Sequence, residues 1–377
     1  MYTIYCDGEL LYSPNVTDTY PVSDAVLKQE LNRADSLTFK MYQNHPLYGS
    51  IDLMKSTIVV FDGDEPISIL RPIAKERDFN NNLKYTCEGC LAFFNDSIVP
   101  VYVFVDSGTM KLVSEYLKWL MDKHGEQIDN EYRKPFAWST DMQNLLLKRE
   151  NHGYPTTFDE VREKLLDMLG GYFLPKYTKT QTGLAKFSIE YNKESGAQGS
   201  QTIQFGRNLV NFSEYIDRTD RITRLVPLGQ KEDGSEDFLT VDGAFDDRTA
   251  TIHDGIFVDA PQAYIDLYGI LVGKRIWEDV TEQDNLLAKA QDWIEDYNEH
   301  EPVSITIGAA DLSYLTNPDN SVLGEQRFRI GQINQVISEP HGIDKPFRCS
   351  ALQIKFDNLA QNVYTFGEVK GTLTRMI

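Results

Sequence analysis

The chain has 377 residues and a formal charge of −20, from 57 acidic and 37 basic side chains. At about 150 residues per domain this length predicts two to four domains, and an apolar content of 41% is enough to build hydrophobic cores. The acidic composition argues against a protein that wraps DNA or binds membranes through a basic surface, although DNA could still pass close by. We find no run of about 18 apolar residues, as a membrane span requires, and no signal peptide at the start. Synthesis in a cytoplasm is therefore expected.

The first hundred residues are predicted to form short strands separated by turns. Apolar and polar residues alternate in Leu37–Met41, which is typical of a half-buried strand. The run Thr57–Phe61 is followed by the turn pair Asp62-Gly63, so a hairpin with Ile67–Leu70 as its return strand is expected. Further strands are predicted at Tyr2–Tyr5, Leu83–Cys87 and Val99–Val105. Closely spaced short strands of this kind favour a small barrel or sandwich.

The pattern changes near residue 106, where an α+β insertion is predicted. Asp106-Ser107-Gly108 opens a helix whose apolar stripe contains Met110, Val113, Leu117 and Leu120. Thr157–Glu160 fits a capping box, and Gly170-Gly171 is a suitable end for the helix that follows. Strands are expected at Leu184–Tyr191 and Thr202–Phe205.

The second half is predicted to repeat this plan of strands interrupted by a helix, without a sequence repeat of fixed period. The helix begins near Thr281, carries Leu286, Ala290, Trp293 and Tyr297 on one side, and is stopped by Pro302. The predicted strands are Ile222–Leu228, Phe238–Val241, Val303–Ile307, Phe328–Val336, Ala351–Phe356 and Thr372–Thr374.

The sequence carries weak signals of catalysis or metal binding. Zinc-protease, serine-hydrolase and nucleotide-binding motifs are absent. The six histidines are scattered, and none lies three or four residues from another: His45, His124, His152, His253, His300 and His341. With 57 carboxylates, selecting a glycosidase pair would be arbitrary.

Two short motifs are interpreted as structural. Cys87 and Cys90 form a CxxC pair, but a structural zinc needs four ligands and no second pair exists. In a strand, positions three apart point to opposite faces, so we interpret both as buried thiols. Asp233, Ser235 and Asp237 alternate as in a calcium loop but lack its glycine and distal glutamate, so a hairpin tip is expected. We therefore predict no catalytic residue, no cofactor-binding residue, no metal ligand and no cofactor.

Several segments, in their order and spacing, carry a resemblance to a known family. They are Ala34–Phe39, Pro46–Tyr48, Thr57–Gly63, Ile69–Ile73, Tyr85–Ser97, Phe205–Leu209, Asp220–Gly229, Tyr268–Ile270, Trp277–Val280, Ile305–Ile307, Ala310–Leu312, Tyr364–Gly367 and Leu373–Thr374. Together they resemble the tail hub proteins of phages and prophages of low-GC Gram-positive bacteria. That family is described as prophage endopeptidase tail protein, or as the N-terminal part of tail-associated lysins. One departure is Leu70-Arg71, where relatives often have Gly-Arg, and it predicts a change in a local bend.

The resemblance implies a β-rich α+β fold like the baseplate hub of contractile tails, with two small β-barrels and inserted α/β and helical subdomains. The expected segments are a first barrel at 1–105, completed by about 206–220; an α+β insertion at 106–205; the start of a second barrel with a helical insertion at 221–302; and the remaining barrel and closing strands at 303–377. Longer relatives continue into fibre or peptidoglycan-hydrolase regions. None is seen before Ile377, so their enzyme activity is not expected here.

By resemblance, the chain is a structural hub at the virion tail tip, made in the cytoplasm of a bacterial host. It would form a homotrimer, join the tail tube and distal tail protein to the tip, and enclose the channel for tape-measure protein and DNA. A fibre or receptor-binding protein is a further possible partner. DNA would pass without specific binding, and the charge of −20 predicts a net acidic channel wall. The alternatives are a tail-associated peptidoglycan endopeptidase or muralytic enzyme and a host-surface carbohydrate-binding module.

Overall fold

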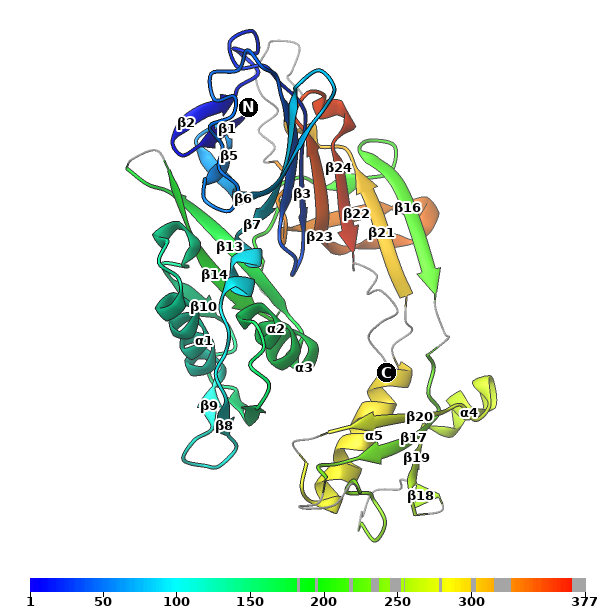
Figure 1. The fold of residues 1–377 in the computed structure, drawn as a ribbon. Helices are drawn as coiled ribbons and strands as arrows, with labels where there is room; N and C mark the ends of the chain where they lie inside the picture. Colours follow the sequence, from blue (N-terminus) through cyan, green and yellow to red (C-terminus); the bar gives the residue numbers. More distant parts are fainter. Residues whose placement is uncertain are drawn as a thin grey trace. The chain divides into compact units, whose positions relative to one another are not determined.

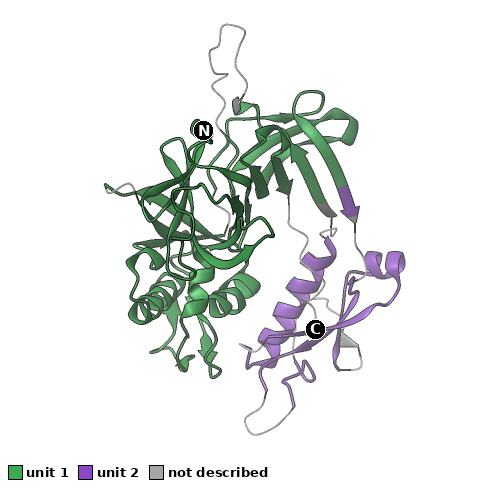
Figure 2. Ribbon diagram, turned by 45° about the horizontal axis from the view of Figure 1, so that its top comes forward, with its two compact units in different colours: residues 1–213, 305–377 green, residues 214–304 purple. Residues whose placement is uncertain are grey.

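The computed structural model describes residues 1–181, 184–193, 196–216, 220–231, 237–244, 252–253, 255–277, 280–299, 303–314 and 327–367. The chain divides into two compact units, which we describe separately (Figure 1, Figure 2). Unit 1 comprises Met1–Ser213 and Ile305–Ile377, and unit 2 comprises Glu214–Ser304. Strands outnumber helices in the described residues, so the predicted β-rich α+β class is confirmed.

A sheet of thirteen strands forms the larger part of unit 1. Ten of its strands are β1 (Tyr2–Cys6), β2 (Glu9–Tyr12), β3 (Val22–Glu30), β4 (Ser36–Met41), β5 (Ile58–Asp62), β6 (Glu65–Arg77), β7 (Leu83–Gly89), β21 (Val303–Ala309), β23 (Ile343–Lys355) and β24 (Val363–Gly367). The other three are β15 (Ile203–Gln204), β16 (Leu209–Ile216) and β22 (Ile333–Ser338). Short helical turns lie at η4 (Leu312–Tyr314), η5 (Glu339–His341) and η6 (Leu359–Gln361).

The strand order shows how the two predicted barrels are joined. It runs β16-β21-β24-β23-β3-β4-β7-β6-β5-β1-β2, with β22 and β15 attached beside β23. β3 pairs antiparallel with β4 on one side and with β23 on the other. β23 is thirteen residues long, and it pairs with β22 along its first part and with β3 and β24 along its second. One continuous sheet therefore joins strands from both predicted barrels, and neither barrel closes within the residues that the structure describes.

Strand β5 explains why this sheet supports two hydrophobic cores. All five of its residues, Ile58–Asp62, are buried. Ile58 and Val60 face one core, built from the sheet itself, whereas Val59 and Phe61 face a second core shared with the middle of the chain. Because side chains alternate along a strand, a run that is apolar at every position can pack on both faces.

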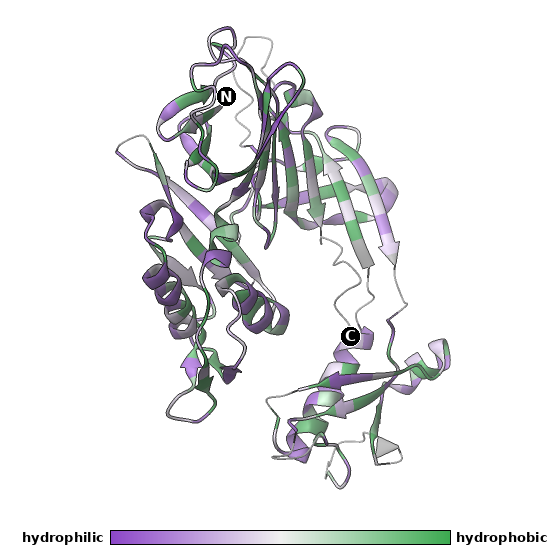
Figure 3. Ribbon diagram, viewed as in Figure 1, coloured by the Kyte–Doolittle hydropathy of each residue, from purple (hydrophilic) through white to green (hydrophobic). Residues whose placement is uncertain are grey.

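The middle of the chain, residues 90–192, covers that second face. Its helical segments are η1 (Cys90–Asp96), α1 (Val113–Gln127), η2 (Glu131–Arg133), α2 (Thr157–Val161), η3 (Arg162–Leu166) and α3 (Asp167–Leu169). Its strands are β8 (Tyr102–Phe104), β9 (Lys111–Leu112), β10 (Trp138–Thr140), β11 (Leu146–Leu147), β12 (Arg149–Asn151), β13 (Tyr172–Lys179) and β14 (Ala185–Asn192). Helix α1 is amphipathic: its buried Tyr116, Leu117 and Leu120 join the second core, and hydrophilic colour follows its other side (Figure 3).

Unit 2 has two layers, a four-stranded sheet and a helix. The sheet order is β18 (Ile252–His253), β19 (Phe257–Asp259), β17 (Arg224–Leu228) and β20 (Val272–Ile276). The helices are α4 (Gln262–Tyr268) and α5 (Gln283–Glu299). Leu286, Leu287, Ala290 and Ile294 of α5 form a third core with Leu225 and Val258 of the sheet. The four domain segments expected from the sequence stay a prediction.

Most predicted elements are present, with shifted boundaries. The cap of the α2 segment is Thr156, one residue before the predicted Thr157, and its hydroxyl accepts from the Asp159 N–H at 3.1 Å. Gly170, with φ of 71°, ends that helical segment as predicted. The expected strand Phe238–Val241 forms only an isolated bridge between Phe238 and Lys231. The predicted strand at 372–374 and the helix stop at Pro302 lie outside the described residues.

Candidate functional site: a charged cleft at the Asp62 turn

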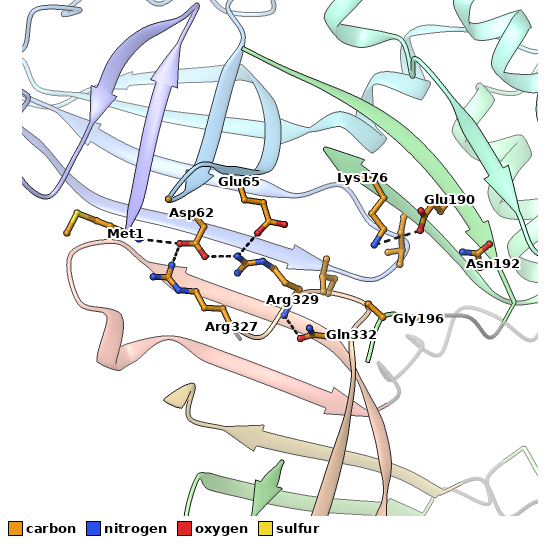
Figure 4. Close-up of a pocket in the computed structure, with 15 residues that line it drawn as sticks. Met1, Asp62, Glu65, Lys176, Glu190, Asn192, Gly196, Arg327, Arg329 and Gln332 are labelled. Carbon is orange, nitrogen blue, oxygen red and sulfur yellow. Dashed lines mark hydrogen bonds and ion pairs between the residues drawn. The ribbon is translucent and has the colours of Figure 1, made fainter. Parts of the chain in front are cut away.

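A cleft of about 960 Å³ lies in unit 1 beside the turn between β5 and β6 (Figure 4). Its walls come from that turn, from β13 and β14, and from the chain around residues 196–197 and 327–332. Seven of the groups lining it carry formal charges: the Met1 ammonium, Lys176, Arg327, Arg329, Asp62, Glu65 and Glu190. Four cationic and three anionic groups therefore meet in one cleft of a strongly acidic chain.

Asp62 is the centre of this charge cluster. Its side chain is 5% exposed, and its carboxylate receives hydrogen bonds from the Met1 ammonium at 3.3 Å and from Arg329 at 2.6 Å. Arg327 forms a further ion pair with the same carboxylate. Arg329 also reaches Glu65 at 3.1 Å (Figure 4). Three cations thus share one buried aspartate, so Asp62 is the common ion-pair partner of all three positive groups.

The electrostatics of the cleft favour a structural contact over an open anion site. Burial and the neighbouring Arg327 and Arg329 lower the pKa of the Met1 ammonium. On the wall formed by β13 and β14, Lys176 lies 3.8 Å from Glu190. Each cation has a carboxylate within ion-pair distance, so an incoming anion would compete with existing partners. The cluster therefore fastens residues 327–332 to the β5–β6 turn.

The sequence predicted the turn that forms one side of this cleft, but it did not predict that Arg327 and Arg329 pair with Asp62 from the other side. The Asp62-Gly63 turn was expected, and Gly63 adopts φ of 62°, which favours glycine. Arg327 and Arg329 flank the buried Phe328, so alternation alone indicates that the two arginines share a side. No local signal identifies Asp62 as their partner, because it lies 267 residues from Arg329.

A second buried ion cluster joins the large sheet to η1. The Arg71 guanidinium is 4% exposed and donates to Glu88 at 2.8 Å from Nε. It also donates through both terminal nitrogens to the two carboxylate oxygens of Asp96, at 2.9 Å to Oδ1. Its plane lies 5.2 Å from the Phe93 ring. This forked contact uses the planar geometry that distinguishes arginine from lysine.

Asp35 is a buried carboxyl between the two cores. Its Oδ2 accepts from Ser68 at 2.6 Å, Gln29 at 2.8 Å and Tyr177 at 3.3 Å. Burial raises the pKa of Asp35 to about 6, and these three hydrogen bonds oppose that rise. The folded state therefore holds a proton on Asp35 at a pH where the unfolded chain has lost it.

Replacing Asp35 with asparagine should remove a pH dependence of stability. Because the pKa of the folded state is raised, the wild type loses stability as pH increases from about 4 to 6, and the loss persists above 6. Relative to wild type, Asp35→Asn should gain on the order of 2–3 kcal/mol between pH 4 and pH 7. Urea unfolding of both proteins at each pH measures this. The exposed Asp122→Asn is the matched control, and an Asp35→Asn difference that does not change with pH would contradict the assignment.

The CxxC cysteines lie on opposite faces of the sheet, as predicted. Cys87 belongs to the first core and Cys90 to the second. Both are free and buried, and burial raises the pKa of each thiol. A thiol with a raised pKa is a poor nucleophile and a poor metal ligand at neutral pH. The pair therefore contributes to packing.

Three of the histidines make contacts with neighbouring groups of the protein. His45 Nε2 lies 2.9 Å from the Leu11 carbonyl, and His341 Nδ1 lies 2.6 Å from the Ser338 hydroxyl. His152 lies 3.7 Å from Glu150 on the surface. Across the described ranges, no three His, Cys, Asp or Glu side chains gather as a metal ion would require. Asp233 and Ser235 of the calcium-like motif lie outside those ranges.

Ser97 and His124 are the pair most like a nucleophile and its base. Ser97 Oγ is 2.7 Å from His124 Nδ1 and 2.7 Å from Thr157 Oγ1. His124 Nε2 donates to the Arg133 carbonyl at 3.0 Å, so Nδ1 accepts from the serine. The two side chains are 1% and 0% exposed, and burial lowers the pKa of His124. No substrate can reach this pair, which instead ties η1 to α1 and to the start of α2.

Comparison with known proteins identifies the fold. A family model described as prophage endopeptidase tail matches residues 197–377, just under half of the chain. The structure resembles a prophage MuSo2 43 kDa tail protein from Shewanella oneidensis, with a TM-score of 0.59 at 12% identity, over 98% of each chain. The resemblance to prophage tail proteins is confirmed.

Two further tail proteins share this fold. A tail protein from Neisseria meningitidis MC58 has a TM-score of 0.56 at 14% identity, covering 97% of this chain and 96% of that one. Prophage tail protein gp18 from Listeria monocytogenes EGD-e has a TM-score of 0.51 at 15% identity, covering 93% and 89%. No protein with a curated description matches the sequence. At these identities the likeness establishes the tail-protein fold. Within the described ranges, no helix is both long enough and apolar enough to cross a membrane.

Proposed function

We propose that this chain is a structural hub of a phage tail tip or baseplate that assembles as a homotrimer. It would join the tail tube and distal tail protein to the tip and surround the channel for tape-measure protein and DNA. The observation that carries the proposal is the tail-protein fold, shared over 89–98% of three tail proteins, two of them from prophages. The family match of residues 197–377 supports it independently from the sequence.

The open edges of the large sheet support an assembling subunit. Among the strands that the structure describes, the order ends at β2 on one side and at β16 on the other. On β16, Val210 is 70% exposed and Tyr215 is 45% exposed. An edge strand with exposed apolar side chains is a liability in a monomer, because its free backbone groups can pair with other chains. Contact between subunits in a ring would cover such edges.

Mass photometry tests the trimer directly. The chain alone should give a species of three times its 43.1 kDa mass, or it should form a complex with three copies of the chain after mixing with the distal tail protein of the same phage. Val210→Lys on the β16 edge should weaken that species, whereas Asp122→Lys on the exposed side of α1 should leave it unchanged. A chain that stays monomeric with its tail partner present would contradict the hub proposal.

A non-catalytic role is the second part of the proposal. The sealed Ser97–His124 pair and the buried thiols offer no accessible nucleophile among the described residues. Purified chain should release no peptide from bacterial cell walls. Hydrolysis abolished by a single carboxylate, histidine or cysteine substitution would overturn this and restore the endopeptidase alternative. The acidic channel wall is tested by the structure of the assembled ring, in which a basic lumen would contradict it.

A further inference from the structure

Strand β20 is an uncovered edge of the unit 2 sheet. The sheet order ends at β20, which pairs in parallel with β17. Figure 1 shows the two strands side by side. In the part of the chain that the structure describes, no strand lies on the other side of β20. Its outer backbone groups therefore lack the ladder partners that a central strand has.

The hydrogen bonds at both ends of β20 identify which backbone groups face outward. The Leu271 carbonyl accepts from Thr223 and Arg224, each at 2.9 Å, and the Trp277 N–H donates to the Leu228 carbonyl at 2.7 Å. Odd-numbered residues therefore point toward β17. Since N–H and C=O directions alternate along a strand, the backbone groups of Val272, Lys274 and Ile276 point away from the sheet.

The side chains of β20 alternate between the two faces of the sheet. Arg275 lies 4.7 Å from the Trp293 ring of α5 and 5.4 Å from the Trp277 ring, so its side chain is on the face of the sheet where α5 lies. Val272, Lys274 and Ile276 project from the opposite face. Val272 is 61% exposed, Ile276 is 40% exposed, and Lys274 is exposed and forms no ion pair with the described residues.

Exposed apolar side chains continue from this edge into the preceding turn. Leu267, Ile270 and Leu271 are 68%, 54% and 39% exposed. A single lysine is a common protection of an edge strand. Here that lysine is flanked by exposed Val272 and Ile276 and by this apolar turn, which together are typical of an interaction surface.

We propose that the β20 edge binds an extended segment of another protein by strand addition. The bound segment would pair with the outward backbone groups of Val272, Lys274 and Ile276. It would place apolar side chains opposite Val272 and Ile276. It would place a carboxylate opposite Lys274, because that lysine is exposed and forms no ion pair with the described residues. The proposal does not rest on the trimer of the proposed hub, and its test uses the isolated chain.

The probe is the synthetic peptide acetyl-SVTDTVS-amide, whose alternate residues present valine, aspartate and valine on one face. At about 1 mM peptide, hydrogen exchange of the intact chain should slow at the amides of Val272, Lys274 and Ile276. The amides of Gly273 and Arg275, which already face β17, should change little. No protection at this edge would overturn the proposal. Protection at high protein concentration without peptide would also overturn it, because the occupant would then be a second copy.

Three substitutions of Lys274 distinguish the contribution of its backbone N–H to peptide binding from the contribution of its charge. Lys274→Pro removes an outward N–H, which an edge strand tolerates, and should abolish peptide binding. Lys274→Ala keeps the N–H and should weaken binding by up to about fivefold. Lys274→Glu should transfer the preference to acetyl-SVTKTVS-amide. Unchanged Trp277 and Trp293 fluorescence verifies folding. Peptide binding by Lys274→Pro equal to wild type would refute strand addition.

Discussion

Replacing Arg71 with alanine is expected to lower the free energy of unfolding by about 3 kcal/mol. The substitution would leave Glu88 and Asp96, which are 27% and 26% exposed, facing each other without their cation. Loss of one partner from a buried ion pair costs roughly 3–5 kcal/mol, and the partial exposure of both carboxylates places this site at the lower end. The Phe93 ring would also lose its contact with the guanidinium.

Urea unfolding followed by fluorescence can localise the effect of Arg71→Ala. Trp119 and Trp138 pack against the second core, which contains η1, whereas Trp277 and Trp293 lie in unit 2. The unfolding transition that Trp277 and Trp293 report for unit 2 should be the same as in the wild type. Arg71→Lys keeps the charge but loses the forked geometry, so an intermediate loss is expected. Arg33→Ala removes a surface pair with Glu30 and should cost no more than about 0.5 kcal/mol. Equal losses for Arg71→Ala and Arg33→Ala would contradict a buried cluster.

The sequence predicted the elements that have strong local patterns and missed β3. Val22–Glu30 contains Ala25, Leu27, Lys28, Gln29 and Glu30, residue types that favour helices in isolation. In the fold, Ala25 and Leu27 enter the first core, and the strand is held by β4 and β23 on its two sides. Tertiary pairing overrides local propensity here. β3 thereby joins strands of the first β section to strands of the last.

Long-range charge pairing set a similar limit on predicting the site. The turn at Asp62-Gly63 could be predicted from its own two residues. The opposite faces of Cys87 and Cys90 could be predicted from their spacing in the sequence. The partners of Asp62 could not, because Arg327 and Arg329 meet it only after β1, β5 and the last third of the chain have assembled. Among many arginines and carboxylates, spacing alone does not select a pair. The same limit applies to Arg71, whose partners lie 17 and 25 residues away.

Replacing Asp62 with asparagine should be the second large perturbation, with a loss of about 3 kcal/mol. Asparagine keeps the size of the side chain but removes the negative charge that Arg327, Arg329 and the Met1 ammonium share. The two arginines are 21% and 28% exposed, so water screens their repulsion only in part. Hydrogen exchange should rise at residues 327–332, which these contacts fasten to the β5–β6 turn, while unit 2 keeps its wild-type rates.

The same turn provides a matched control for this prediction. Asp64 lies two residues from Asp62, is 99% exposed at its side chain, and pairs with Lys179 at 3.0 Å. Asp64→Asn removes the same charge from the same turn, but from a solvated position, so its effect should stay within about 0.5 kcal/mol. If the two variants were equally stable, net charge alone would explain the change and the fastening role of Asp62 would be wrong. A large loss confined to Asp62→Asn would instead show that three cations converging on one buried carboxylate hold the first and last parts of unit 1 together.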